Sequence, residues 1–146
     1  MDGSLSPEAK FVIDLPEDDI RAGRVCPYCG HPPSLISTDF GKRWECNLCD
    51  ARVGVHKGTE IPLGSLANRA LREKRKELHE YFDQMWRFAQ AKRGIEKHEA
   101  RNAAYKWLAN EMDMPQVECH IGMMDLEECM MAIRLCKPYF KEKIYI

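Results

Sequence analysis

Cys26-Pro27-Tyr28-Cys29-Gly30 and Cys46-Asn47-Leu48-Cys49-Asp50, two cysteine pairs with sixteen residues between them, decide the fold of this chain. A C-x-x-C turn places two sulfurs on the same side of the backbone. Two such turns facing each other complete the tetrahedral ligand set that zinc prefers. The segment between the pairs has the length of a hairpin that brings one turn to the other. We therefore predict one structural Zn²⁺ ion held by the thiolates of Cys26, Cys29, Cys46 and Cys49.

Two other uses of paired cysteines stay open at this point, namely a redox dithiol and an iron–sulfur centre. Four thiolates fill the coordination sphere of zinc and leave no position for an activated water, so the predicted zinc is not catalytic. Gly30 and Asp50 each follow the second cysteine of a pair. A left-handed backbone is often needed there, and both residue types tolerate it.

The composition excludes several classes of protein. The chain has 146 residues, of which 45% are hydrophobic and 31% charged, as expected for one globular domain or two small joined modules. The first ten residues lack the pattern of a secretory signal, and no run approaches the roughly 18 apolar residues of a membrane span. We expect a cytoplasmic protein. In a reducing cytoplasm its seven cysteines should be metal ligands and buried thiols.

We predict an α+β fold in which a small zinc ribbon of about three short strands packs with a module of about three α-helices. The predicted parts are an acidic N-terminal segment (1–24), the ribbon (25–60) and the helical module (61–146), the last two forming one compact unit. The strands are expected at 34–38, 43–46 and 51–55, with a hairpin turn at 39–42. Residues 11–13 and 139–146 could each add a short strand.

The helices are predicted from apolar spacing and from capping residues. The first should begin after Ser65 as its N-cap and run to about Ala91. Its apolar residues recur at spacings of 3, 4 and 7, which places one seam on one face: Leu71, Leu78, Phe82, Met85 and Ala89. The second is expected over 97–112. The third should begin near Asp125, because Glu128 three residues later completes a capping box.

From Cys26 onward the chain resembles a small bacterial and bacteriophage family, the zinc-finger-containing domain of unknown function. The resemblance covers about residues 25–135, and the chain departs from it in the charged stretch 96–101. It implies a fold and a phage or prophage origin, and it implies no activity. It is carried by Cys26-Pro27-Tyr28-Cys29-Gly30, Trp44-x-Cys46-x-x-Cys49, residues 53–59 and 62–64, Leu71-Arg72-x-x-Arg75, His79-x-x-Phe82-Asp83-x-x-Trp86, Ala104-Tyr105-x-Trp107-Leu108-Ala109 and residues 119–123.

A basic stripe on the first predicted helix is the best functional signal. At about 100° per residue, five side chains fall within roughly a third of the helix circumference: Arg69, Arg72, Arg75, Lys76 and His79. Such a row of cations can follow the phosphates of a nucleic acid. The alternative is a solvated helix face, since Glu73, Glu77 and Glu80 interleave with the cations and weaken their field.

Four further residues are candidates for binding nucleic acid or a partner. Lys42 and Arg43 lie in the predicted hairpin, while His56 and Lys57 lie in the glycine-containing connector that precedes the first helix. A helix N-terminus favours anions, so this connector could hold a phosphate. It could equally be a tight link between the ribbon and the helices.

Two weaker hypotheses involve the remaining cysteines and histidines. Cys119, His120, Cys129 and Cys136 could hold a second metal, although small thiols on an apolar seam are ordinary core residues. His56, His79 and His120 could serve a hydrolase, yet no catalytic motif accompanies them. We therefore expect no enzyme.

The function predicted from these observations is that of a non-enzymatic, phage-type zinc-ribbon accessory protein. It would bind nucleic acid or a nucleic-acid machine through the candidate residues above. The alternative is a protein-binding inhibitor or adaptor acting on a host complex, such as a polymerase or a defence system. In that case the acidic segment 1–24 would be a docking arm or a nucleic-acid mimic.

Overall fold

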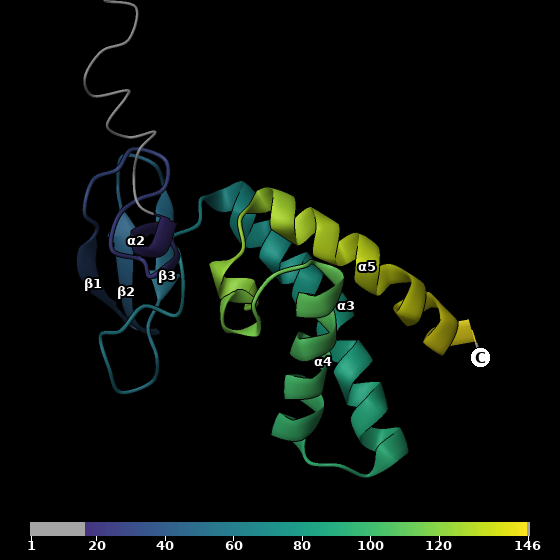
Figure 1. The fold of residues 1–146 in the computed structure, drawn as a ribbon. Helices are drawn as coiled ribbons and strands as arrows, with labels where there is room; N and C mark the ends of the chain where they lie inside the picture. The colour runs from purple at the N-terminus through teal and green to yellow at the C-terminus, as the bar shows by residue number, and fades with distance from the viewer. Residues whose placement is uncertain (1–16, 146) are drawn as a thin grey trace, which may run out of the picture. The chain divides into compact units, whose positions relative to one another are not determined.

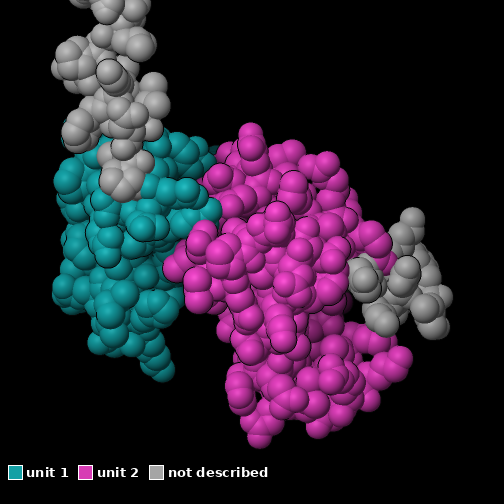
Figure 2. All heavy atoms as spheres, viewed as in Figure 1, with its two compact units in different colours: residues 1–69 teal, residues 70–146 magenta. Residues whose placement is uncertain are grey.

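The computed structural model of the protein describes residues 17–145, and it divides the chain into two compact units, residues 1–69 and 70–146. Figure 1 shows the elements, and Figure 2 colours the two units. Unit 1 contains the three-stranded sheet and one short helix, and unit 2 contains the three long helices. The short strand proposed at 11–13 lies outside the described residues.

The sheet of unit 1 has the strand order β1-β2-β3, with both neighbouring pairs antiparallel. The strands are β1 (Ser34–Thr38), β2 (Gly41–Cys46) and β3 (Ala51–Gly54). Leu35 pairs with Trp44 and Trp44 with Val53, so these three apolar side chains share one face of the sheet. The three predicted strands are confirmed. The hairpin turn is tighter than predicted, because Gly41 and Lys42 already pair with β1.

The chain after β3 folds back along the sheet before the first long helix begins. Arg52 and Ala67 exchange two backbone hydrogen bonds of 3.0 Å, and Val55 pairs with Pro62. This pairing holds Ala67 in a β-bridge, and the helix therefore begins two residues later, at Arg69. The prediction that Ser65 caps this helix is wrong for that reason. Ser65 is buried in unit 1, with only 4% of its surface exposed.

A short helix, α2 (Glu17–Arg21), precedes the first cysteine pair, and it was not predicted. Gly23 follows α2 with a positive φ of 75°. A Cβ atom at this position would lie 2.6 Å from the carbonyl oxygen of Gly64 and 2.8 Å from Cβ of Pro62. Glycine is therefore required here, both for the backbone conformation and for the close approach of this segment to the connector.

Unit 2 contains α3 (Arg69–Arg93), α4 (Lys97–Glu111) and α5 (Leu126–Tyr145), with short 3₁₀ turns η1 (Gln116–Glu118) and η2 (Ile121–Met123) between α4 and α5. The predicted capping box at the start of α5 is confirmed. The backbone N–H of Asp125 donates to Glu128 Oε1 at 2.9 Å, and the N–H of Glu128 donates to Asp125 Oδ1 at 2.8 Å.

The prediction of a C-terminal strand at 139–146 is wrong, because α5 continues to Tyr145 with Pro138 inside it. A strand needs a neighbouring strand to satisfy its backbone groups. The described residues of unit 2 form only helices and turns, so this segment finds no sheet edge within its own unit. A helix satisfies most of the same groups internally.

The core of unit 2 is formed where the apolar seams of the three helices meet. Phe82 and Leu78 of α3 and Leu108 of α4 are completely buried. The rings of Phe82 and Tyr105 lie 4.5 Å apart. Met85 and Ala89, which the predicted seam also included, are only half-buried.

Arg75 ties α3 to the connector before α5. Its guanidinium donates two hydrogen bonds to the carbonyl oxygen of Met124, at 2.8 Å from Nη2 and 3.2 Å from Nε. Met124 is fully buried, so this carbonyl lies in a region from which water is largely excluded. The charged guanidinium of Arg75 therefore stabilises the packing within unit 2.

Replacing Arg75 by methionine should destabilise unit 2, because the aliphatic stem is kept while both hydrogen bonds to Met124 are lost. We expect the free energy of unfolding to fall by about 1.5–3 kcal/mol, the range for hydrogen bonds to charged groups. Urea titrations of the zinc-loaded protein, followed by helical circular dichroism, measure this. Lys76→Met, at an exposed neighbouring position, is the control and should change stability by less than about 0.5 kcal/mol. Equal effects of the two variants would contradict the role given to Arg75.

Candidate metal centre

The sulfur atoms of the four predicted zinc ligands lie together in unit 1. The Sγ atoms of Cys26, Cys29, Cys46 and Cys49 are all within 4.8 Å of one another, and those of Cys29 and Cys46 are 3.6 Å apart. In a regular tetrahedron with zinc–sulfur bonds of about 2.3 Å, the sulfurs lie about 3.8 Å apart. The donor set and its spacing therefore fit zinc. The ribbon holds a single structural zinc site.

Each cysteine pair lies on a tight turn with the backbone conformation that the sequence predicted. Gly30 has a φ of 79° and Asp50 a φ of 51°, both left-handed. In the first turn the N–H of Gly30 donates to the carbonyl of Cys26, and the N–H of Cys26 donates to the carbonyl of His31, both at 2.8 Å. In the second turn the antiparallel pairing of Cys46 with Ala51 closes the loop. The turns thus fix the sulfur positions through backbone geometry.

Backbone N–H groups also point at the sulfurs and favour their ionised form. Burial raises the pKa of Cys26, although hydrogen bonds from the backbone of Tyr28 and Cys29 oppose this. Burial also acts to raise the pKa of Cys46, but hydrogen bonds from the backbone of Cys49 and from the neighbouring thiols outweigh it and lower that pKa. Burial and the adjacent sulfurs raise the pKa of Cys49 to about 12. A bound cation would stabilise all four thiolates together.

The metal centre and the hydrophobic core of the ribbon are the same cluster. Cys26 is completely buried and Cys46 is 6% exposed. They pack with Ala51, Val53 and Leu66, and the half-buried Trp44 lies against this group. The indole N–H of Trp44 donates to the carbonyl of Glu60 at 2.7 Å, which holds the ring over the sheet. So few apolar residues leave the ribbon dependent on its metal.

His31 is a functional neighbour that the sequence analysis missed. Its Nδ1 lies 3.3 Å from the Sγ of Cys29, so an N–H at that atom can donate to the ligand sulfur. Its position directly after Gly30, at the end of the first turn, was the available signal. The Tyr28 hydroxyl of the same turn accepts a hydrogen bond from the backbone N–H of Asn68 at 3.1 Å. The first turn is therefore connected to the segment that leads into α3.

The basic candidates on the ribbon are partly neutralised by nearby carboxylates. Lys42 forms an ion pair with Glu60 at 3.0 Å, and Arg43 forms one with Glu45 at 2.8 Å. His56 and Lys57 are exposed in a turn closed by hydrogen bonds from Thr59 to the carbonyl of His56. This part of the connector is a tight turn, and whether it holds a phosphate or only links the ribbon to the helices stays a prediction.

The basic stripe of α3 divides into two parts. Arg69 and Lys76 are exposed and Arg72 is half-buried, and at about 100° per residue the three fall within an arc of about 60°. Arg75 lies about 60° beyond Arg72, toward the buried seam, and its guanidinium is bound to the carbonyl of Met124. Arg75 is therefore a structural cation of unit 2, separate from the arc of Arg69, Arg72 and Lys76.

Within the described residues, the four ribbon cysteines are the only cluster that could hold a metal. The hypothesis of a second metal site at Cys119, His120, Cys129 and Cys136 is therefore not supported. Cys119, Cys129 and Cys136 are completely buried. Burial raises the pKa of Cys119 and Cys129 to about 11 and that of Cys136 to about 12. These three thiols are core residues of unit 2.

The three histidines considered for catalysis have different neighbours. The Nδ1 of His79 lies 3.6 Å from Asp83 on the same helix, and the ring of His120 packs 5.2 Å from that of Tyr105. Burial, and to a smaller extent the charge of Arg101, lowers the pKa of His120. His56 lies in unit 1, and in the described part of unit 2 no hydrogen bond or ring contact joins His79 to His120.

Comparison with known proteins agrees with this site. Residues 22–139 match a family described as a zinc-finger-containing domain, and the match includes all four ligands and most of unit 2. No curated protein and no solved structure matches the chain. Among the described residues, no helix has the length and apolar character needed to cross a bilayer.

Replacing Cys46 by serine should remove the metal and unfold the ribbon, because three thiolates bind zinc far more weakly than four and the ribbon core is small. Elemental analysis of purified protein should fall from one zinc per chain to well below one. Cys129→Ser is the matched control, since Cys129 is also buried but lies in unit 2. Full zinc content in Cys46→Ser, or an equal loss in Cys129→Ser, would contradict the ligand assignment.

Proposed function

Because the chain belongs to the zinc-finger-containing domain family, we propose that it is a non-enzymatic, phage-type accessory protein that works in the host cytoplasm by binding nucleic acid or a nucleic-acid machine. The zinc gives the ribbon a fixed shape, and α3 leads directly out of it. In this proposal the first turns of α3 supply the cations that contact phosphates.

The arc formed by Arg69, Arg72 and Lys76 is the observation that supports this proposal. The three cations lie at the start of a 25-residue helix, so their spacing along its axis is fixed. They follow one another at about 1.5 Å of rise per residue and span about 10 Å, which is long enough to reach more than one phosphate of a strand. Guanidinium groups are also well suited to phosphate, because they can bind two of its oxygens.

The remaining candidates have smaller parts in the proposal. Lys42 and Arg43 already have carboxylate partners, and their pairs would have to open or reorganise before they could bind a phosphate. The guanidinium of Arg75 already donates to the carbonyl of Met124 within unit 2. His56 and Lys57 stay exposed and could add contacts from the connector turn.

A protein-binding adaptor is the second candidate, and exposed apolar side chains on the ribbon favour it. Phe40, at the β1–β2 turn, is fully exposed, and Leu48, in the second cysteine turn, is 82% exposed. Large apolar side chains at loop tips can insert into a partner's pocket. This reading uses the ribbon, whereas the nucleic-acid reading uses α3, so variants separate the two.

Changing Arg69, Arg72 and Lys76 together to glutamine should weaken binding to a 20-base-pair duplex. Since each phosphate contact contributes about 0.9 to the slope of log K against log salt, we expect the slope to become shallower by about two to three. Fluorescence anisotropy over a series of salt concentrations measures both affinity and slope. The control combines Arg87→Gln, Lys106→Gln and Arg134→Gln, which remove the same charge from exposed positions elsewhere in unit 2.

Equal losses in the two triple variants, or no duplex binding by the unchanged protein, would contradict the nucleic-acid proposal. The adaptor proposal makes a different prediction. After nuclease treatment of the lysate, a host protein should stay bound to the unchanged chain and should not bind the double variant Phe40→Ser, Leu48→Ser.

A further inference from the structure

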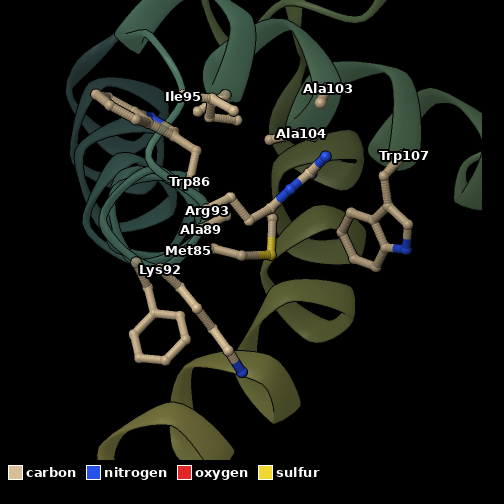
Figure 3. A pocket seen from close by; sticks show the side chains of 11 residues that line it. Met85, Trp86, Ala89, Lys92, Arg93, Ile95, Ala103, Ala104 and Trp107 are labelled. Atoms are coloured by element: carbon tan, nitrogen blue, oxygen red, sulfur yellow. The ribbon is translucent and has the colours of Figure 1, made fainter.

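Unit 2 contains an apolar hollow that neither proposed function uses. It has a volume of about 680 Å³ and lies between the C-terminal half of α3 and residues 100–107 of α4 (Figure 3). Trp86 of α3 and Trp107 of α4 flank it, and Met85 forms part of its wall. The α4 side is lined by small residues, Ala100, Ala103 and Ala104, which leave the space open.

Two cations from the last turn of α3, Lys92 and Arg93, also line the hollow. Figure 3 shows the Arg93 side chain reaching toward α4. Both residues are exposed, and neither forms an ion pair with a carboxylate of the described residues. Among those residues, no aspartate or glutamate lines the hollow. The described residues of the hollow thus combine an apolar wall with two cations at its edge.

We propose that this hollow binds a small organic anion, with an aromatic or branched apolar body against Met85 and Trp107 and a carboxylate or a similar group at Lys92 and Arg93. The volume falls within the range of about 300–1,000 Å³ that is usual for small-molecule sites. Charge complementarity selects an anion, because a cation would be repelled and a neutral group would leave both cations without a partner.

A protein partner fits this hollow less well than a small molecule. A stable protein interface needs about 1,000 Å² or more of buried surface and a surrounding apolar patch. Of the exposed large hydrophobic side chains among the described residues, only Phe88 lines the hollow. The Nζ of Lys92 lies 6.0 Å from the centre of its ring, so a cation stands beside this one exposed apolar side chain of the lining.

Three probes that share one body test the proposal: 2-naphthoate, 2-naphthamide and 2-naphthylmethylammonium. Calorimetric titration of the full zinc-loaded chain gives the affinities, and nuclear magnetic resonance of the Trp86 and Trp107 indole N–H groups locates the site. We expect the naphthoate to bind at least about ten-fold more tightly than the amide, since charge-assisted hydrogen bonds contribute about 1.5 kcal/mol or more. The ammonium probe should bind most weakly.

Variants of exposed residues identify the contributions of charge and shape. Lys92→Gln with Arg93→Gln should lower the naphthoate affinity about ten-fold, to that of the amide, and leave the amide affinity unchanged. Ala103→Trp fills the hollow from an exposed helix position and should abolish binding of all three probes. Lys106→Gln, an exposed cation of α4 outside the hollow, is the matched control and should change nothing.

Several outcomes would overturn the proposal. Equal affinity for the three probes would remove the role of Lys92 and Arg93, and unchanged binding in Ala103→Trp would place the probes elsewhere. A dimer that forms with rising concentration and dissociates in Ala103→Trp would make the hollow an interface between copies of the chain. Binding of an acidic amphipathic peptide without binding of naphthoate would indicate a protein partner instead.

Discussion

Four buried or half-buried sulfurs within 4.8 Å of one another are the constraint on which the ribbon depends. Burial disfavours the ionised form of cysteines that lie this close together, because each thiolate loses its hydration and repels the others. A shared divalent cation reverses this balance, and structural zinc sites of this kind contribute on the order of 10 kcal/mol or more to folding. The cluster of Cys26, Cys46, Ala51, Val53 and Leu66 is too small to replace that contribution. The backbone N–H groups aimed at Cys26 and Cys46 prepare the sulfurs for the metal.

The same constraint explains why the segments around the ribbon are fixed. Gly23 lies against the connector at Gly64, the Tyr28 hydroxyl accepts from Asn68, and Trp44 donates to Glu60. These contacts join the segment at Gly23, the first cysteine turn and β2 to residues 60–68. The contacts of Tyr28 and Trp44 therefore extend from the zinc ribbon to residues outside the ligand turns. The exposed ends of the ribbon, at Phe40 and Leu48, stay available for partners in the proposed functions.

Local signals in the sequence predicted those features that depend on neighbouring residues. The ligands follow from cysteine spacing, the strands from alternation and turns, and the start of α5 from the Asp125–Glu128 pair. The features that differ from the predictions depend on contacts between residues distant in sequence. Ser65 has the right residue type for an N-cap, but the pairing of Arg52 with Ala67 delays the helix to Arg69. Arg75 has the right charge for the basic stripe, but its angle on the helix brings it to the carbonyl of Met124. The hollow of unit 2 required the positions of two helices, which spacing along one helix does not give.

The account depends most on the coordination of the metal by sulfur alone. X-ray absorption at the zinc K-edge of the full chain measures the type, number and distance of the ligand atoms directly. We predict four sulfur neighbours at about 2.3 Å and no nitrogen or oxygen in the shell. A spectrum that requires a nitrogen ligand, which His31 could supply, or fewer than four sulfurs would contradict the assignment of Cys26, Cys29, Cys46 and Cys49 as the complete ligand set.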